Sequence, residues 1–122
     1  MVAQSNRQEL ARRGEDLAAE ALTARGLEIL ARNYRFREGE IDIIARDGEC
    51  VVFVEVKTRT GPFFPPCASV DGRKQRRLRT LATHWLAEQR SLDRPCRFDV
   101  VAVYVQRAPP HDARLEHIEG AF

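Results

Sequence analysis

The sequence is poor in lysine and has no long apolar run. It contains eighteen arginines but only two lysines, Lys57 and Lys74. No apolar stretch approaches the ~20 residues that a membrane-spanning helix needs, and the N-terminal "MVAQSNRQEL" lacks the apolar core of a secretory signal. We therefore expect a cytoplasmic protein that does not enter a membrane.

Cysteine is also scarce, and its spacing excludes two classes of small protein. Cys50, Cys67 and Cys96 are odd in number, widely separated and without any CxxC pair. This pattern argues against a disulfide framework and against a zinc site. We expect reduced thiols.

The remaining composition is that of a soluble globular protein. The chain has 122 residues, of which 43% are hydrophobic and 31% are charged. This length suits one domain with one core, so we assign residues 1–122 to a single domain. The net charge of +2 is too small to identify a partner, so the distribution of charge matters more than its sum.

Basic residues gather in two short segments, "DGRKQRRLR" and "ARNYRFR". Such clusters suit contacts with the phosphates of a nucleic acid, although the first is equally typical of a solvated helix face. The candidate phosphate-contacting residues are Arg35, Arg37, Arg73, Lys74, Gln75, Arg76 and Arg77. Lys74 and Gln75 begin the apolar stripe of a predicted helix, so we place them near its N-terminus, where phosphate binding is favoured.

Hydrophobic periodicity predicts two helices and five strands. Helices are expected over 8–25 and from Asp71 to about Gln89, with Asp71 near the helix start and Trp85 in the core. Strands are expected over 27–34, 40–46, 50–58 and 97–105, with a short last strand within 114–122. The predicted fold class is α/β, in the order αβββαββ. The proline-interrupted "GPFFPP" at 61–66 is expected to be a loop that contacts a nucleic-acid junction or a second copy of the chain.

Three charged residues interrupt the β-branched segment Gly39 to Arg59. Glu55 and Lys57 are two apart on one strand, so they share a face. A turn of two or four residues at Asp47-Gly48 would set Asp42 opposite Phe53, on the same face, whereas a three-residue turn would reverse this parity. We expect one pocket at a sheet edge. Two converging carboxylates favour a divalent cation such as Mg²⁺.

The choice of lysine at position 57 supports a specific role. The chain uses arginine almost everywhere that a positive charge is needed, so Lys57 indicates a need for a compact ammonium group. The alternative is an ordinary ion pair between Glu55 and Lys57 on a solvated strand.

The motif that these residues form resembles the D…(D/E)xK core of the PD-(D/E)XK nuclease superfamily. "GEIDIIARDGECVVFVEVKTR", with "RKQRRL", "RFDVVAV" and "HIEGAF", resembles the YraN-like family of small bacterial predicted endonucleases, which are distantly similar to archaeal Holliday-junction resolvases. The resemblance implies a restriction-endonuclease-like αβββαβ core, with a mixed central sheet flanked by two helices. It also implies Mg²⁺ or Mn²⁺ dependence and cleavage of phosphodiesters, in branched or otherwise structured DNA.

The resemblance assigns roles to four residues. Asp42 and Glu55 would bind the metal, and Lys57 would orient or help to deprotonate the attacking water. Glu15 lies on the inward stripe of the first helix and would join the metal site, unless it pairs with Arg12 one turn earlier.

Two other classes of function stay open at this point. One is a nucleic-acid-binding module with the nuclease fold but little turnover, and the other is a protein-binding scaffold. Asp99 is expected to neutralise Arg97 or cap a turn rather than act in catalysis. The three histidines, His84, His111 and His117, have no metal-ligand spacing and receive no role.

Overall fold

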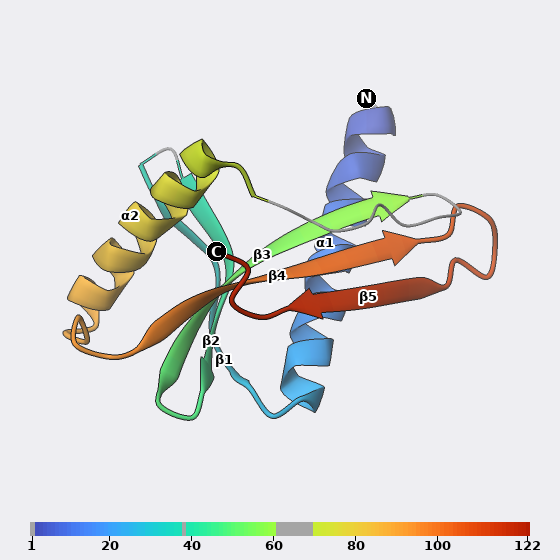
Figure 1. The fold of residues 1–122 in the computed structure, drawn as a ribbon. Coiled ribbons are helices and arrows are strands. Elements are labelled where there is room, and N and C mark those ends of the chain that lie inside the picture. Colours follow the sequence, from blue (N-terminus) through green and yellow to red (C-terminus); the bar gives the residue numbers. More distant parts are fainter. Residues whose placement is uncertain (1, 38, 61–69) are drawn as a thin grey trace.

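A computed structural model describes residues 2–37, 39–60 and 70–122 of the chain (Figure 1). The predicted "GPFFPP" loop and Cys67 lie outside these residues. Of the described cysteines, Cys50 and Cys96 are both free, as expected. No helix in the described ranges combines the length and the apolar character that crossing a bilayer requires.

The predicted order of elements is confirmed, with small changes at their ends. The elements are α1 (Val2–Ala24), β1 (Glu28–Phe36), β2 (Gly39–Asp47), β3 (Cys50–Thr60), α2 (Gly72–Glu88), β4 (Cys96–Val105) and β5 (Ala113–Ile118). Helix α2 begins after Asp71, whose side chain accepts a hydrogen bond from the backbone N–H of Lys74. This N-cap satisfies one of the otherwise unpaired amides of the first turn.

The five strands form one mixed sheet in the order β1-β2-β3-β4-β5. Strands β3 and β4 are parallel and are joined through α2, whereas the other neighbouring pairs are antiparallel. This is the αβββαβ core that the motifs imply, extended by a C-terminal strand. Strand β3 lies between β2 and β4, but its ladder with β2 ends at Val54, so Glu55 and Lys57 pair with β4 alone.

The turn between β2 and β3 lies one residue further along the chain than predicted. Asp47 remains in the ladder opposite Cys50, so the two-residue turn consists of Gly48 and Glu49. Gly48 has φ +60, at the first central position, where hairpin turns favour glycine. Ile44 therefore faces Phe53, and the predicted pairing of Asp42 with Phe53 is wrong. The parity of the paired residues from Ile43 to Asp47 is unchanged, because the sum of the paired residue numbers shifts by two.

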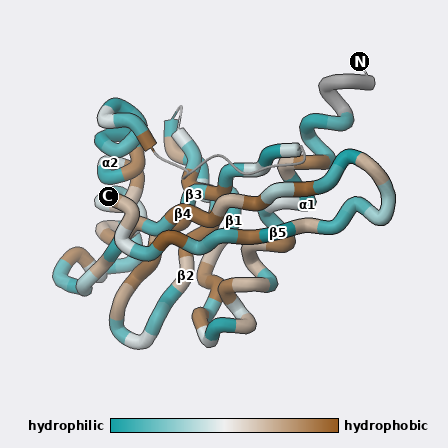
Figure 2. The backbone as a smooth tube through the Cα atoms, turned by 45° about the vertical axis from the view of Figure 1, so that its right-hand side comes forward, coloured by the Kyte–Doolittle hydropathy of each residue, from teal (hydrophilic) through white to brown (hydrophobic). Residues whose placement is uncertain are grey.

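Each helix packs on its own apolar cluster. Ala18 and Leu22 of α1 pack with side chains on alternate positions of β2, β3 and β4, including Val54 and Val101. Trp85 of α2 belongs to the other cluster, together with strand residues that alternate with those of the first cluster, such as Phe53. Because successive strand residues point to opposite faces, the helices cover opposite faces of the sheet. Figure 2 shows the hydrophobic strand segments between them.

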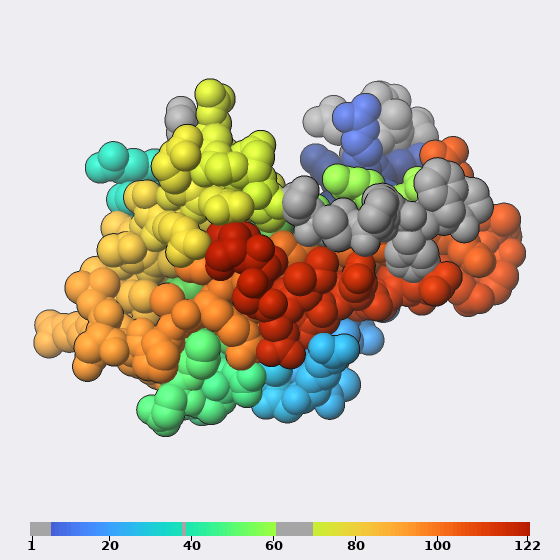
Figure 3. Space-filling model, in the orientation of Figure 1, coloured from blue at the N-terminus to red at the C-terminus, as the bar shows by residue number. Residues whose placement is uncertain are grey.

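The C-terminal segment returns to α2 after β5. The backbone N–H of Ala121 donates to the carbonyl of Phe98, and the ring of Phe122 stacks on Phe98 with centroids 5.0 Å apart. The guanidinium of Arg79, on α2, lies over both rings. Figure 3 shows this segment lying against the helix. The predicted basic segment on α2 therefore includes an arginine, Arg79, that stabilises the fold.

Asp99 neutralises Arg97, as the sequence predicted. Its fully buried carboxylate accepts hydrogen bonds from Arg97 Nε at 3.0 Å and the backbone N–H of Gly120 at 3.0 Å, and it lies 2.8 Å from His117 Nε2. Burial alone would raise the pKa of Asp99, but these partners hold it below its ordinary value. Asp99 therefore ties β4 to β5 and to the C-terminal segment.

Candidate metal centre

Strand β2 departs from regular alternation at Asp42. Ile41 packs in the cluster under α2, whereas Ile43, two residues later, packs in the cluster under α1. Residues two apart on a regular strand share a face, so the strand changes its orientation between them. The ladder with β3 ends at the pair Ile43 and Val54, and Oδ2 of Asp42 then accepts a 2.8 Å hydrogen bond from the backbone N–H of Val56. The Asp42 side chain thus occupies the place of a backbone partner where the two strands separate.

Three carboxylates meet at this point. Oxygen atoms of Glu15, Glu40 and Asp42 all lie within 4.8 Å of one another, and all three residues are half-buried. Glu40 precedes Asp42 by two residues on β2, and Glu15 comes from α1. Carboxylate oxygens this close repel one another when they are ionised, so the arrangement favours a cation.

Close packing of α1 on the sheet brings Glu15 to the cluster. A Cβ atom at Gly14 would lie 1.9 Å from Oγ1 of Thr58, on β3, so only glycine lets the helix approach this closely. Glu15, the next residue, has a side chain that is 19% exposed. Its hydrogen-bond partner is Asn33 rather than the alternative, Arg12.

Polar groups of β1 surround the carboxylates. The side-chain amide of Asn33 donates to Glu15 at 3.0 Å and to Glu40 at 2.8 Å, so one residue bridges two members of the cluster. Asn33 has φ 53, a left-handed conformation that asparagine tolerates better than most residues.

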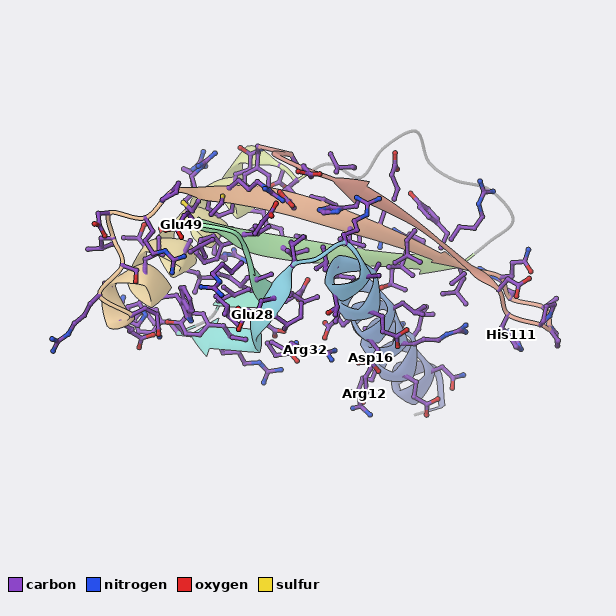
Figure 4. The ribbon with its side chains drawn as sticks, turned by 90° about the horizontal axis from the view of Figure 1, so that it is seen from below. Arg12, Asp16, Glu28, Arg32, Glu49 and His111 are labelled. Atoms are coloured by element: carbon purple, nitrogen blue, oxygen red, sulfur yellow. The ribbon has the colours of Figure 1, made fainter. Side chains whose placement is uncertain are left out.

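Two arginines of β1 form ion pairs beside the cluster. Arg32 pairs with Asp16 of α1 at 2.8 Å, and Figure 4 shows these two side chains facing each other. Arg35 pairs with Glu40 at 3.1 Å.

The electrostatic environment favours the protonated form of Asp42. Burial, followed by the negative charge of Glu55, raises the pKa of Asp42 to about 7. The hydrogen bond from Val56 lowers the pKa, and the charges of Glu15 and Glu40 raise it. Asp42 therefore stands where a negative charge is poorly compensated by the protein itself.

Glu55 lies on β3, buried, and points toward the start of α2. Its carboxylate oxygen Oε2 forms an ion pair with Nζ of Lys74. Lys57 follows two residues later on β3, opposite Ala102 of β4, and is half-buried. Glu55 is close enough to raise the pKa of Asp42, but it is not among the three carboxylates whose oxygens meet within 4.8 Å.

The structure brings most of the predicted site residues into one region. Asp42 and Glu15 meet directly, and Glu55 and Lys74 pair beside them. Glu40 was missed, although its period-two spacing from Asp42 in "GEID" is a usable signal. Asn33 was also missed, and its sequence context, "ARNYR", gives no comparable indication.

The predicted basic residues lie on two neighbouring surfaces. Arg73, Arg76 and Arg77 are exposed on α2, and Gln75 is half-buried, with its amide donating to the carbonyl of Val70. Arg35 and Arg37 are exposed at the end of β1 and just beyond it. Both surfaces adjoin the carboxylate region, since Lys74 begins the first and Arg35 contacts Glu40.

The same residues are central to a family match. Residues 14–103 match the model described as "Uncharacterised protein family UPF0102". The chain belongs to the UPF0102 family. This is the YraN family, so the resemblance drawn from the motifs is confirmed. The UPF0102 match includes the three clustered carboxylates, Glu55 and Lys57, and it ends before β5.

UPF0102 proteins of several bacteria are similar to this chain over nearly their whole length. One from Parafrankia sp. strain EAN1pec is 53% identical over 117 residues, covering 94% of this chain and 97% of the relative. One from Geobacter metallireducens is 48% identical over 114 residues, covering 93% and 91%. One from Symbiobacterium thermophilum is 53% identical over 110 residues, covering 89% and 92%.

Proposed function

We propose that this UPF0102 protein is a metal-dependent endonuclease that hydrolyses phosphodiester bonds in nucleic acid, with branched or otherwise structured DNA as its substrate. The observation that carries the proposal is the convergence of Glu15, Glu40 and Asp42 within 4.8 Å, with Glu55 close enough to raise the pKa of Asp42 and Lys57 two residues further along β3. A protein-binding scaffold gives no reason for this convergence. The exposed arginines on α2 and beside β1 supply positive charge for the substrate.

The residues present fit a hard divalent cation. Mg²⁺ and Mn²⁺ prefer carboxylate oxygens, and Mg²⁺ is commonly held by one or two protein carboxylates together with substrate phosphate and water. The raised pKa of Asp42 indicates that the protein alone does not balance the negative charge here. Asp42, Glu15 and Glu40 would hold the ion, and Glu55 would join them if Lys74 released it. A bound ion of this kind supplies Lewis acidity and lowers the pKa of a bound water.

The protein's own groups would position the other reactants. Lys57 would orient the attacking water and offset negative charge that develops on the phosphate, for which a compact ammonium is suited. Lys74 would hold the Glu55 carboxylate in place and present positive charge near the start of α2. Asn33 would keep Glu15 and Glu40 together, because its amide bonds to both. The hydrogen bond from Val56 would fix the direction of the Asp42 carboxylate.

The test is cleavage by the purified protein with Mg²⁺ or Mn²⁺ of labelled four-way junctions, flaps, single strands and linear duplexes. We expect cleavage of at least one structured substrate, loss of cleavage in EDTA, and a loss of at least about 100-fold in Asp42→Asn. The matched control is Asp93→Asn, which removes an exposed aspartate in the loop after α2. No cleavage of any substrate by the wild-type protein, or equal activity of Asp42→Asn, would contradict the proposal.

A binding module without turnover is the second candidate, and one observation favours it. Glu55 is paired with Lys74 instead of meeting the other carboxylates, which leaves the predicted ligand set incomplete. Lys74→Met tests this pairing. If Lys74 only withholds Glu55 from the metal, the variant should bind Mn²⁺ more tightly than the wild type in calorimetry. Cleavage separates the two candidates, because a binding module would cleave none of the substrates either as the wild type or as Lys74→Met.

A further inference from the structure

A pocket lies between α2 and the residues at the end of β1 and the start of β2, outside the carboxylate cluster. Its volume is about 270 Å³, and its lining residues are Phe36, Arg37, Gly39, Arg77, Thr80 and Leu81. Phe36 and Leu81 supply apolar surface, while Arg37 and Arg77 supply guanidinium groups from opposite walls. This combination of apolar surface and two cations suits a ligand that is flat and apolar in one part and anionic in another.

The wall formed by Phe36 belongs to a fixed stack of planar groups. The His84 ring lies against the Phe36 ring, with centroids 3.5 Å apart and planes 20° apart. Nδ1 of His84 is 2.6 Å from the hydroxyl of Tyr34, which also donates to Glu88 at 2.7 Å. The Arg37 guanidinium lies over the same Phe36 ring, 5.2 Å from its centroid. His84 and Arg37 thus cover the Phe36 ring, and nucleobases stack on guanidinium planes as well as on aromatic rings, so the Arg37 guanidinium is a suitable surface for an unpaired base.

The backbone of Arg37 gives an independent indication that its side chain is needed. Arg37 has φ 58, a left-handed conformation that costs free energy for residues other than glycine. A turn at this position would form more easily with glycine or asparagine. An outlier of this kind, found next to a pocket, points to a function for the side chain.

The α2 wall of the pocket leads toward the carboxylate region, because Lys74 of α2 pairs with Glu55. On β2, Gly39 lines the pocket on the α2 side, whereas the next residue, Glu40, points to the α1 side, so the route between them passes along α2. Arg77 follows Lys74 by three residues on α2, an axial rise of about 4.5 Å, and so lies on the same side of the helix. A nucleic-acid strand that placed one phosphate at the carboxylates would bring a neighbouring nucleotide to the pocket.

We infer that this pocket receives one unpaired nucleotide next to the phosphate that is cleaved. The base stacks on the Arg37 guanidinium, which Phe36 and His84 support from behind, and contacts Leu81, and its phosphate pairs with Arg77. This inference rests on the proposed function for its position relative to the cleaved bond. It specifies a substrate with at least one unpaired nucleotide at that point, because a base inside a continuous duplex cannot enter the pocket.

The first test compares two neighbouring arginines in EDTA, so that binding is measured without cleavage. Arg77 lines the pocket, whereas Arg76 is also exposed on α2 but is not among the lining residues. The probes are a fluorescein-labelled 12-nucleotide oligothymidylate and a 12-base-pair duplex, followed by fluorescence anisotropy. Arg77→Gln should weaken single-strand binding by about tenfold and Arg76→Gln by less than about threefold, with similar effects of both on the duplex. Equal losses for the single strand would overturn the inference.

The second test asks whether the pocket recognises a base. Wild-type protein should bind the oligothymidylate at least about fivefold more tightly than a strand of the same length with abasic residues, because stacking is lost in the latter. Thr80→Leu, which narrows the pocket, should remove this preference. Thr83→Leu is the matched control, since Thr83 is also exposed on α2 and both hydroxyls bond to the carbonyl four residues earlier. A preference that survives in Thr80→Leu would count against base binding.

Arg37→Asn tests whether a lost preference for bases could instead result from misfolding. Asparagine tolerates the left-handed conformation, so the variant should unfold at the same temperature as the wild type or higher while losing most of its preference for bases. The outcomes for the pocket and for catalysis are separable. A wild-type protein that cleaves with Mg²⁺ but has no base preference would refute the pocket alone, and one that prefers bases but never cleaves would refute the endonuclease alone.

Discussion

The backbone N–H of Val56 donates a 2.8 Å hydrogen bond to Oδ2 of Asp42, and this contact joins β2 to β3 beyond the last pair of their ladder. It aims the carboxylate of Asp42 into the region where Glu15 and Glu40 also point. The position of the candidate site therefore depends on a local separation of two strands. The consequence is a half-buried carboxylate whose ionisation opposes the stability of the fold.

The stability of the metal-free protein should fall as the pH rises from about 4 to about 7. The folded protein retains a proton on Asp42 up to a pKa of about 7, whereas the unfolded chain releases it near its ordinary value of 3.8. The folded state therefore binds more protons within this range, and a rise in pH favours the unfolded state. Asp42→Asn should remove this dependence and stabilise the protein at pH 8 by roughly 2–4 kcal/mol.

Urea denaturation in EDTA at pH 4.5 and pH 8 measures this effect. The variant and the wild type should differ at pH 8 and become nearly equally stable at pH 4.5. Asp93→Asn, at an exposed position, should show no such pattern. If Asp42→Asn were equally destabilising at both pH values, the hydrogen bond from Val56 would outweigh the cost of the buried charge.

Gly14→Ala should destabilise the protein by roughly 1–3 kcal/mol, as expected for overpacking. Alanine is the better helix former by about 1 kcal/mol, but its Cβ would lie 1.9 Å from Oγ1 of Thr58. The clash should therefore outweigh the gain in helix propensity. Combining it with Thr58→Ala should recover part of the loss, and thermal unfolding of the two single variants and the double variant measures the coupling.

The same substitution tests how α1 positions Glu15. A displaced helix should weaken Mn²⁺ binding in calorimetry, and Thr58→Ala in the Gly14→Ala background should restore some of it. An Mn²⁺ affinity that is unchanged in Gly14→Ala would show that Glu15 is not a required ligand.

Asp99→Asn should cost about 3 kcal/mol of stability, the magnitude expected when a buried ion pair loses one partner. The carboxylate is fully buried and carries the charge that Arg97 needs. Because the pKa of Asp99 lies below its ordinary value, its contribution to stability is present above about pH 4 and is lost as the pH falls. The gap between variant and wild type should therefore narrow in acid.

Cleavage by the folded fraction of Asp99→Asn should remain close to that of the wild type. This expectation follows because the partners of Asp99 lie in β4, β5 and the C-terminal segment, and it separates a structural role from a catalytic one. A folded Asp99→Asn protein that had lost cleavage would contradict it.

The order of elements could be predicted because each segment carries a clear local pattern. Alternating and continuous apolar runs indicate strands, and the spacing of Leu78, Leu81 and Trp85 indicates a helix with one buried side. The N-cap at Asp71 is equally local. These signals are independent of tertiary contacts, so the fold class follows from the sequence and its motifs.

The details of the site depended on features without a local signal. The predicted turn was one residue too early, because both Asp47-Gly48 and Gly48-Glu49 place a glycine in the turn. The change in orientation of β2 at Asp42 arises from packing on two helices at once, so strand periodicity alone cannot show it. The pairing of Glu55 with Lys74 joins residues nineteen positions apart in sequence across a crossover. Glu40 does have a local signal, because it lies two residues before Asp42 on the same strand.

Lys57→Met should abolish cleavage while leaving the fold and Mn²⁺ binding nearly intact. The reason is that the proposed role of its ammonium is to act on the water and on charge that develops during the reaction, and such interactions lower the barrier without being needed for binding. Single-turnover cleavage, thermal unfolding and calorimetry with Mn²⁺ would be measured on the same preparation. A modest change in stability with cleavage retained is the pattern of an ordinary ion pair, which contributes about 0–1 kcal/mol when partly exposed.

Lys57→Arg is the sharper companion, because it keeps the positive charge and changes its shape. An ion pair would tolerate the planar guanidinium, so activity would survive if charge alone mattered. The compact ammonium of Lys57 is half-buried on the central strand, and a larger group that donates in one plane should neither fit the same space nor hold a water in the same direction. We therefore expect Lys57→Arg to cleave at least about 100-fold more slowly than the wild type. Cleavage at the wild-type rate would contradict the role proposed for Lys57 even if Asp42→Asn were inactive, and it would leave the carboxylates as the whole of the catalytic site.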